Sequence, residues 1–299
     1  MGIAGHKARW PITLTCEVLE VSASGYFEHW RRKDADKPSR PGVNKRISDE
    51  ALLVYIKAIH AEVKQEYGWP RMWKELVARG FRVGKERVTK LMRLHGIKAR
   101  GKRKFVNTTD SKHDLPIAPN LLDRRFTAPA PNRVCTSEIT YIATDEGWLY
   151  LTAVIDLFSR QVVGWCMSEH MQASVVVDAL RMAWFRRRPE PGLIFHSDRG
   201  SQYCGDDFQE TLKGYKMRSS MSRRGDCWDN ARTESLWGRL KVGRLYGRRF
   251  ATRRQAMDEV IDGLTFYNHK RLHSTLEYVS PMTFEQRWIA AQQQDRKSA

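Results

Sequence analysis

An acid at the end of a buried strand and a second acid on a later helix are the features that most constrain this chain. Asp198 closes the apolar run 193–197 and precedes a turn at Arg199-Gly200. Glu234 lies in the segment 229–241, whose apolar and charged positions have the spacing of an amphipathic helix. Carboxylates brought close together repel each other unless a cation intervenes, and bound divalent cations are the usual means of phosphodiester chemistry. The two acids therefore predict a divalent-metal site.

The sequence around these acids carries a family resemblance. Asp198 and Glu234 are separated by thirty-five residues, and the flanking sequence includes His-Ser-Asp-Arg-Gly-Ser-Gln-Tyr (196–203) and Cys-Trp-Asp-Asn-Ala (227–231). These segments resemble those of the DDE transposases of bacterial insertion sequences, specifically the integrase-like second-frame subunit (OrfB) of the insertion-sequence-three family. The segments 139–142, 147–151 and 154–160 fall where that family has its first strands, and Tyr267-Asn268 with Arg271-Leu272-His273 matches its closing motif.

One position departs from the family pattern. The first catalytic acid of the family is an Asp, and Glu138 stands at that position here. A Glu carries its carboxylate one methylene farther out, and metal-assisted catalysis tolerates little displacement of the reacting centre. We expect weak metal binding to survive and turnover to fall steeply. Asp156, on the next predicted strand, is an alternative metal ligand, although a structural role is favoured.

The composition narrows the class of partner. The 299 residues include 52 Lys and Arg against 34 Asp and Glu, which gives a net charge of +18 and favours a polyanion, with DNA or RNA leading. No apolar run approaches the roughly 20 residues that span a bilayer, and no signal peptide is present, so we expect a cytoplasmic protein that is nucleoid-associated when bound to DNA. The five scattered cysteines predict reduced thiols.

Shifts in composition and helix-breaking segments along the sequence predict that the chain is divided into five regions. The helices and turn of the first region predict a helix-turn-helix, and a helical hairpin that only packs is equally compatible with them. The regions are a helix-turn-helix-like segment with a linker (1–44), a helical DNA-binding-like domain (45–97), a basic, Pro-rich linker (98–131), a catalytic core (132–288) and a C-terminal tail (289–299).

The order of elements in the core predicts its fold class. Three strands with short connections (136–143, 148–157 and 161–167) imply antiparallel pairing. Two strand and helix pairs follow: a helix (173–186) with a strand (193–197), then a helix (205–214) with a strand (216–221). We therefore predict an α/β protein with a ribonuclease H-like core, a mixed five-stranded sheet with helices, preceded by all-α helix-turn-helix-like domains. The acids on the first strand, at the end of the fourth strand and on the next helix then converge at one edge of the sheet.

Several polar and basic residues are predicted to contact DNA, with solvated surface as the alternative for Arg223, Arg224 and the basic segment 235–257. Asn230 and Lys241 share the helix face of Glu234. The segment 235–257 contains seven basic residues and no acid, and we expect it to continue the catalytic helix along the path of the DNA end. The predicted contacts are Asn230, Lys241, Arg223, Arg224, Arg239 and Arg244, with Lys102, Arg103 and Lys104 in the linker, where an unbound flexible tether is the alternative.

The resemblance implies a mechanism and its partners. Mg²⁺ ions, with Mn²⁺ as a substitute, are expected at Glu138, Asp198 and Glu234, which would cleave element ends and join 3′-OH strands by transesterification. The implied partners are double-stranded DNA (terminal inverted repeats and target DNA), a homo-oligomeric assembly and an upstream-frame (OrfA) protein. Three alternatives stay open: a ribonuclease H proper, a phage or retroviral-type integrase, and a catalytically inactive DNA-binding relic or disabled variant.

Overall fold

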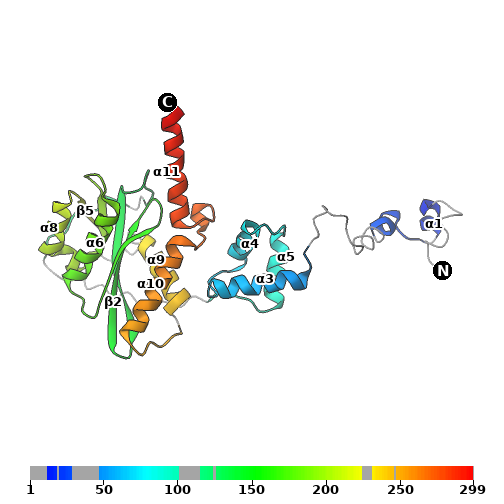
Figure 1. The fold of residues 1–299 in the computed structure, drawn as a ribbon, viewed down its shortest axis with the longest axis horizontal. Coiled ribbons are helices and arrows are strands. Elements are labelled where there is room, and N and C mark those ends of the chain that lie inside the picture. Colours follow the sequence, from blue (N-terminus) through cyan, green and yellow to red (C-terminus); the bar gives the residue numbers. More distant parts are fainter. Residues whose placement is uncertain are drawn as a thin grey trace. The chain divides into compact units, whose positions relative to one another are not determined.

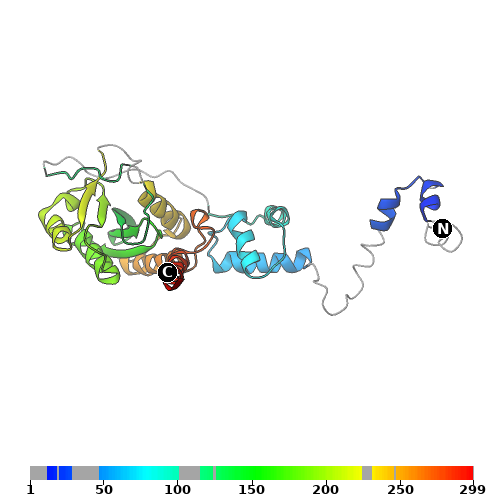
Figure 2. The same ribbon diagram turned by 90° about the horizontal axis from the view of Figure 1, so that it is seen from above.

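A computed structural model describes residues 12–18, 20–28, 47–100, 115–123, 126–223, 231–245 and 247–298. The chain divides into two compact units, Met1–Leu52 and Leu53–Ala299 (Figure 1; Figure 2). The predicted contacts Lys102, Arg103, Lys104, Arg224 and Asn230 lie outside the described residues. In the part of the chain that is described, no helix is both long and apolar enough to cross a membrane.

The first unit contains α1 (Ile12–Val18) and a short helix over residues 23–28. The Ser22 hydroxyl accepts a hydrogen bond from the Gly25 N–H (3.0 Å), and the Ser22 carbonyl accepts one from the Tyr26 N–H (2.9 Å). Ser22 is therefore the N-cap of this second helix.

Three helices form the helical domain around residues 47–100. They are α3 (Asp49–Glu62), α4 (Trp69–Ala78) and α5 (Lys85–Leu94). Pro70 lies in the first turn of α4, where a missing N–H has no helical partner to lose. His95 is exposed and caps the end of α5. Within the second unit, the buried apolar residues of these helices are Ile56, Ile59, Met72, Leu76, Val88, Leu91 and Met92.

A mixed five-stranded sheet forms the core in the order β3-β2-β1-β4-β5. The pairs β1–β2 and β2–β3 are antiparallel, and β1–β4 and β4–β5 are parallel. This arrangement confirms the predicted fold class. The strands are β1 (Val134–Thr144), β2 (Gly147–Asp156), β3 (Val162–Ser168), β4 (Ile194–Ser197) and β5 (Arg218–Met221).

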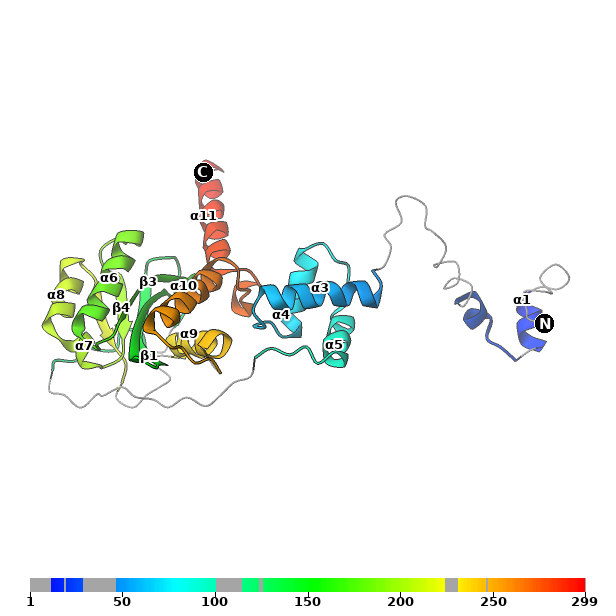
Figure 3. The same ribbon diagram turned by 60° about the horizontal axis from the view of Figure 1, so that its bottom comes forward.

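Helices cover both faces of the sheet. On one face lie α6 (Ala173–Arg187), α7 (Ser201–Cys204) and α8 (Asp206–Gly214), and on the other lie α9 (Ala231–Leu240) and α10 (Arg253–His269) (Figure 3). Alternation along β2 explains the two cores, because Leu149, Leu151, Ala153 and Ile155 pack with α9 and α10 while Val154 packs with α6. Gly164 lets α6 approach β3, since a Cβ there would lie 2.3 Å from the Ala179 carbonyl oxygen.

The basic segment does not continue the helix of Glu234, so that prediction is wrong. The α-helix α9 ends at Leu240, a π-helical turn η3 follows (Lys241–Leu245), and α10 begins at Arg253. Gly247 has a φ of 73°, in the left-handed region that ends helices. The remaining elements are the 3-10 turn η4 (Ser274–Leu276) and α11 (Pro281–Ser298), so the predicted C-terminal tail is helical.

Candidate active site

The register between β1 and β4 brings two of the predicted acids together. Ser137 pairs with Ser197 in the parallel ladder, Glu138 follows Ser137 within β1, and Asp198 is the first residue after β4. Neighbouring strands lie about 4.8 Å apart, and side chains at matched positions of a parallel pair leave the same face. Glu138 and Asp198 therefore stand side by side where β4 ends.

Asp198 is fixed by the turn that follows it. Its Oδ1 accepts a hydrogen bond from the Gly200 N–H (3.0 Å), and its carbonyl oxygen accepts one from the Ser197 hydroxyl (3.0 Å). A Cβ on Gly200 would lie 3.1 Å from Asp198 Oδ1 and 3.2 Å from Gln202 Oε1. The Asp-Arg-Gly sequence thus makes a tight turn that closes directly onto the carboxylate.

Tyr203 of α7 hydrogen-bonds to the residue that precedes Glu138 on β1. Its side chain is fully buried, and its hydroxyl hydrogen-bonds to the Ser137 hydroxyl at 2.8 Å. Burial raises the pKa of Tyr203 well above its usual value, and the Asp198 charge raises it further. Tyr203 is therefore a neutral hydrogen-bonding group that ties α7 to β1 beside Glu138.

Lys241, the first residue of η3, lies near Glu138. Its Nζ is 5.2 Å from the ring centroid of Tyr141. Burial lowers the pKa of Lys241, and the charge of Glu138 acts in the opposite direction. The ammonium group therefore contributes positive charge within the electrostatic range of the first acid.

Glu234 lies on α9, whose Leu236, Trp237 and Leu240 pack on the sheet. The Glu234 side chain is outside the described part of the chain. Among the side chains that are described, no group of three or more His, Cys, Asp or Glu is placed to hold a metal ion. The structure thus juxtaposes the first two acids and locates the backbone of the third.

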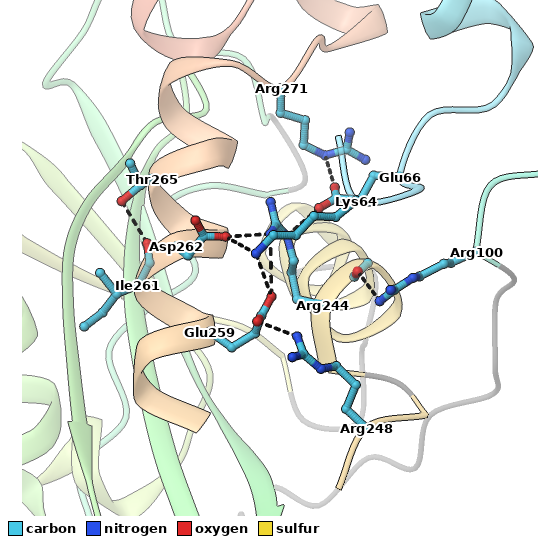
Figure 4. A network of polar contacts seen from close by, with 11 residues as sticks. Lys64, Glu66, Arg100, Arg244, Arg248, Glu259, Ile261, Asp262, Thr265 and Arg271 are labelled. Carbon is cyan, nitrogen blue, oxygen red and sulfur yellow. Dashed lines mark hydrogen bonds and ion pairs between the residues drawn. The ribbon is translucent and has the colours of Figure 1, made fainter. Parts of the chain in front are cut away.

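The described basic residues predicted to contact DNA differ in their environments. Arg223 is exposed and forms an ion pair with Asp123. Arg239 is half-buried and its Nη1 donates to His273 Nδ1 at 3.1 Å. The prediction that Arg244 contacts DNA is wrong, because this side chain is 2% exposed and binds carboxylates of Glu66 and Asp262 (Figure 4).

Asp156 has the structural role that the sequence favoured. Its carboxylate is completely buried and accepts hydrogen bonds from the Asn132 N–H (2.8 Å), the Ser159 N–H (2.8 Å) and the Ser159 hydroxyl (2.9 Å). It pairs across the ladder with Cys135, three positions before Glu138 on β1. Asp156 therefore anchors the loops of Asn132 and Ser159, because three hydrogen-bond donors engage its carboxylate and its strand partner lies three positions before Glu138.

The closing motif, Tyr267-Asn268 with Arg271-Leu272-His273, contacts the edge of the sheet at β3. Asn268 Oδ1 accepts from the Val162 N–H (2.9 Å) and its Nδ2 donates to the Val162 carbonyl (2.8 Å), so this side chain pairs with edge strand β3 as a strand would. His273 is buried against the Tyr267 ring with a centroid distance of 4.8 Å. Burial, followed by the charges of Arg239 and Arg271, lowers the His273 pKa to about 2.

Sequence reasoning missed the supporting contacts of Ser137, Tyr203 and Tyr141. Tyr203 lies inside the segment 196–203 that carried the resemblance, which was a signal for its importance. Nothing in the local sequence pairs it with Ser137, sixty-six residues earlier.

Comparisons with known proteins agree with this architecture. A family model described as HTH-like domain matches residues 48–105, and two described as integrase core domain match residues 128–227 and 215–281. The 31 kDa protein of insertion element IS600 from Shigella sonnei is 40% identical over 274 residues, which cover 91% of this chain and 98% of that protein. Transposase InsF of insertion sequence IS3A from Escherichia coli K12 is 38% identical over 289 residues, which cover 96% of this chain and 98% of that protein.

A solved structure of the HTLV-2 integrase catalytic core domain in complex with magnesium is 14% identical, with a TM-score of 0.39, and covers 53% of this chain and 97% of that one. The sequence relatives extend across nearly the whole chain and include a named transposase. This chain, with its HTH-like domain and integrase core, therefore belongs to the IS3 family of insertion-sequence transposases.

Proposed function

We propose that this transposase cleaves the ends of its element and joins the freed 3′-OH strands at Glu138, Asp198 and Glu234, and that Glu138 limits its turnover. The observation that carries this proposal is the parallel register of Ser137 and Ser197, which sets Glu138 and Asp198 next to each other. Carboxylate oxygens are the hard donors that Mg²⁺ prefers, so the chemistry of this pair fits a divalent cation.

These carboxylates would hold Mg²⁺, with Mn²⁺ as a substitute. When bound, the metal supplies a lower pKa for an attacking water or hydroxyl and neutralises charge on the phosphoryl oxygens. Asp198 enters this role preorganised, because the Gly200 N–H and the turn fix one of its oxygens. Lys241 adds a positive charge near Glu138 that suits a phosphate.

The reaction balances without a covalent protein intermediate. Water attacks the phosphorus at the element end, the P–O bond to the 3′ oxygen breaks, and that oxygen leaves as a 3′-OH. The freed 3′-OH then attacks a second phosphodiester, and the displaced 3′ oxygen leaves with a proton. Because joining exchanges one phosphodiester for another, it needs no external source of energy.

The proposed partners follow from the same chemistry. The HTH-like and integrase core domains and the net charge of +18 support binding to DNA, which we assign to double-stranded terminal inverted repeats and target DNA. Joining requires two DNA ends in one complex, so we propose a homo-oligomer on DNA, with an upstream-frame (OrfA) protein as a further partner.

The deciding experiment measures cleavage and joining of a labelled end of the parent element, with Mg²⁺ and then Mn²⁺. It compares this chain with Glu138→Asp, with Glu138→Asp/Asp198→Asn as the inactive control. We expect Glu138→Asp to react about ten- to a hundred-fold faster, because displacing a reacting centre by about 1 Å has a cost of that order.

Equal rates for the two chains would overturn the claim that Glu138 limits turnover. Absence of reaction from both, with DNA binding intact and no rescue by the upstream-frame protein, would overturn the catalytic proposal in favour of a DNA-binding relic.

A further inference from the structure

Arg244 is a buried cation in η3 that is bound from two directions. Its Nε donates to Glu66 Oε1 at 2.6 Å, and its Nη1 donates to Asp262 Oδ2 at 2.6 Å (Figure 4). Its guanidinium also lies 4.8 Å from the Phe266 ring centroid. A buried guanidinium is retained only where carboxylates compensate its charge, so these acids dictate the position of the turn that carries it.

The contact from Glu66 comes from the segment between α3 and α4, in the helical domain. Glu66 also packs on the η3 backbone, since a Cβ on Gly243 would lie 2.9 Å from Glu66 Cδ. Arg100, after α5, donates from Nη1 to the Gly243 carbonyl at 2.8 Å. Two side chains of the helical domain therefore contact η3: Glu66 binds the Arg244 side chain, and Arg100 binds the Gly243 backbone carbonyl.

A π-helical turn depends on such outside support. π-helices are rare, occur mostly as single turns, and are frequent at functional sites. On its other side, η3 packs on α10 at Gly263, where a Cβ would lie 2.8 Å from Leu240 Cδ1 and 3.2 Å from Arg244 Cγ. The turn η3 thus lies between α10 and the helical domain, and it packs closely on α10 at Gly263 and on Glu66 at Gly243.

The same turn begins with Lys241, which lies beside Tyr141 and within electrostatic range of Glu138. We propose that Glu66 and Arg100 are positioning residues, through which the helical domain holds η3 in its π-helical form and thereby sets Lys241 at the active site. This inference rests on the proposed function of the Glu138 site, and it makes the helical domain part of the catalytic apparatus as well as a DNA-binding module.

Other contacts between the helical domain and the core join residues that lie outside η3. The Tyr67 hydroxyl accepts from the Leu272 N–H at 2.9 Å, and Arg71 Nε donates to the Leu272 carbonyl at 2.8 Å. Lys64 pairs at 2.7 Å with Asp262 Oδ2, the oxygen that also accepts from Arg244, so Lys64→Ala removes a charge from this network while Arg244 keeps both of its carboxylate partners. Loss of Glu66 or Arg100 alone should therefore leave these contacts in place, which makes the variants informative.

The test uses Glu66→Gln and the milder Arg100→Ala in the Glu138→Asp chain, with Lys64→Ala as the matched control from the same network. Amide hydrogen exchange of residues 241–245 is measured first, and the single-turnover cleavage rate at saturating DNA second. We expect Glu66→Gln to accelerate exchange in this turn at least ten-fold and to slow cleavage at least ten-fold, with unchanged DNA affinity. Arg100→Ala should change both in the same direction, and Lys64→Ala should change neither.

The outcomes separate this inference from the proposed function. Unchanged exchange in both Glu66→Gln and Arg100→Ala, or an equal response in Lys64→Ala, would overturn the support of η3 by the helical domain. Faster exchange with an unchanged cleavage rate would overturn the link from η3 to Lys241. If no chain cleaves DNA but exchange responds as expected, the support of η3 is upheld and the proposed function fails.

Discussion

Ser137 and Ser197 lie opposite each other in the parallel pair of β1 and β4, and the residue after each is a candidate catalytic acid. Glu138 lies within β1 and Asp198 directly follows β4, so the ladder that ends at Ser137 and Ser197 sets where these two residues start. A longer side chain at the first position cannot be offset by a shift of the strand. This is the physical reason to expect a Glu in place of Asp to lower turnover.

The turn that fixes Asp198 leads to a first prediction. Gly200→Ala should slow strand cleavage about ten-fold or more in the Glu138→Asp chain, because the added Cβ would contact Asp198 Oδ1 at 3.1 Å and displace the carboxylate. Gly214→Ala is the control, since a Cβ there meets nothing within 4 Å. Cleavage assays on both variants test this, and equal rates for both would contradict the role of Gly200.

The buried hydrogen bond between Ser137 and Tyr203 gives a second prediction. Tyr203→Phe should lower the free energy of unfolding by about 1–3 kcal/mol, because it leaves the buried Ser137 hydroxyl without its partner. Adding Ser137→Ala to that variant should cost less than Ser137→Ala costs in the original chain. Urea unfolding of the four proteins of this double-mutant cycle measures the coupling, and strictly additive effects would show that the bond contributes nothing.

Asn268 provides a third prediction about the edge of the sheet. Asn268→Ala should destabilise the protein by about 2–4 kcal/mol, because the N–H and the carbonyl of buried Val162 both lose their partner. Asn268→Asp keeps the acceptor but places a carboxylate oxygen against the Val162 carbonyl. That variant should regain stability as the pH falls and the carboxyl is protonated, whereas Asn268→Ala should not, which urea unfolding at several pH values can check.

His273 predicts a dependence of stability on pH. Its pKa is lowered from 6.5 to about 2 in the folded protein, chiefly by burial and then by Arg239 and Arg271. Below pH 6.5 the unfolded chain binds a proton that the folded protein does not, so this contribution to stability is complete above pH 6.5 and declines as the pH falls toward 2. The loss approaches about 1.4 kcal/mol per pH unit.

In His273→Gln this proton-linked loss is absent, so the free energy of unfolding should depend less steeply on pH between 6 and about 4. Parallel urea titrations of the two proteins give the two slopes. Identical slopes would mean that His273 is protonated in the folded protein and that its burial among arginines does not depress its pKa.

The order of helices and strands and the positions of the acids on them could be predicted from the sequence, because both depend on residues that are close together along the chain. Asp198 follows the apolar run 193–197, which forms β4, and the short connections 145–146 and 157–161 link antiparallel strands as their lengths require. Amphipathic spacing likewise identified the helix of Glu234. Local hydrophobic pattern and connection length dictate such features whatever the rest of the chain does.

The role of each charged side chain was decided by the tertiary structure. Arg244 belongs to a basic run, which favoured a DNA contact, yet it is buried against Glu66, a residue 178 positions earlier. Asp156 ends β2 and accepts from donors in two loops, at Asn132 and Ser159, whereas Asp198 follows β4 and accepts from Gly200 in its own turn. The sequence by itself determined which residues could carry charge to the edge of the sheet. Burial and partner distance decide which of them stay available for DNA and metal, and these arise only when segments far apart in the chain pack together.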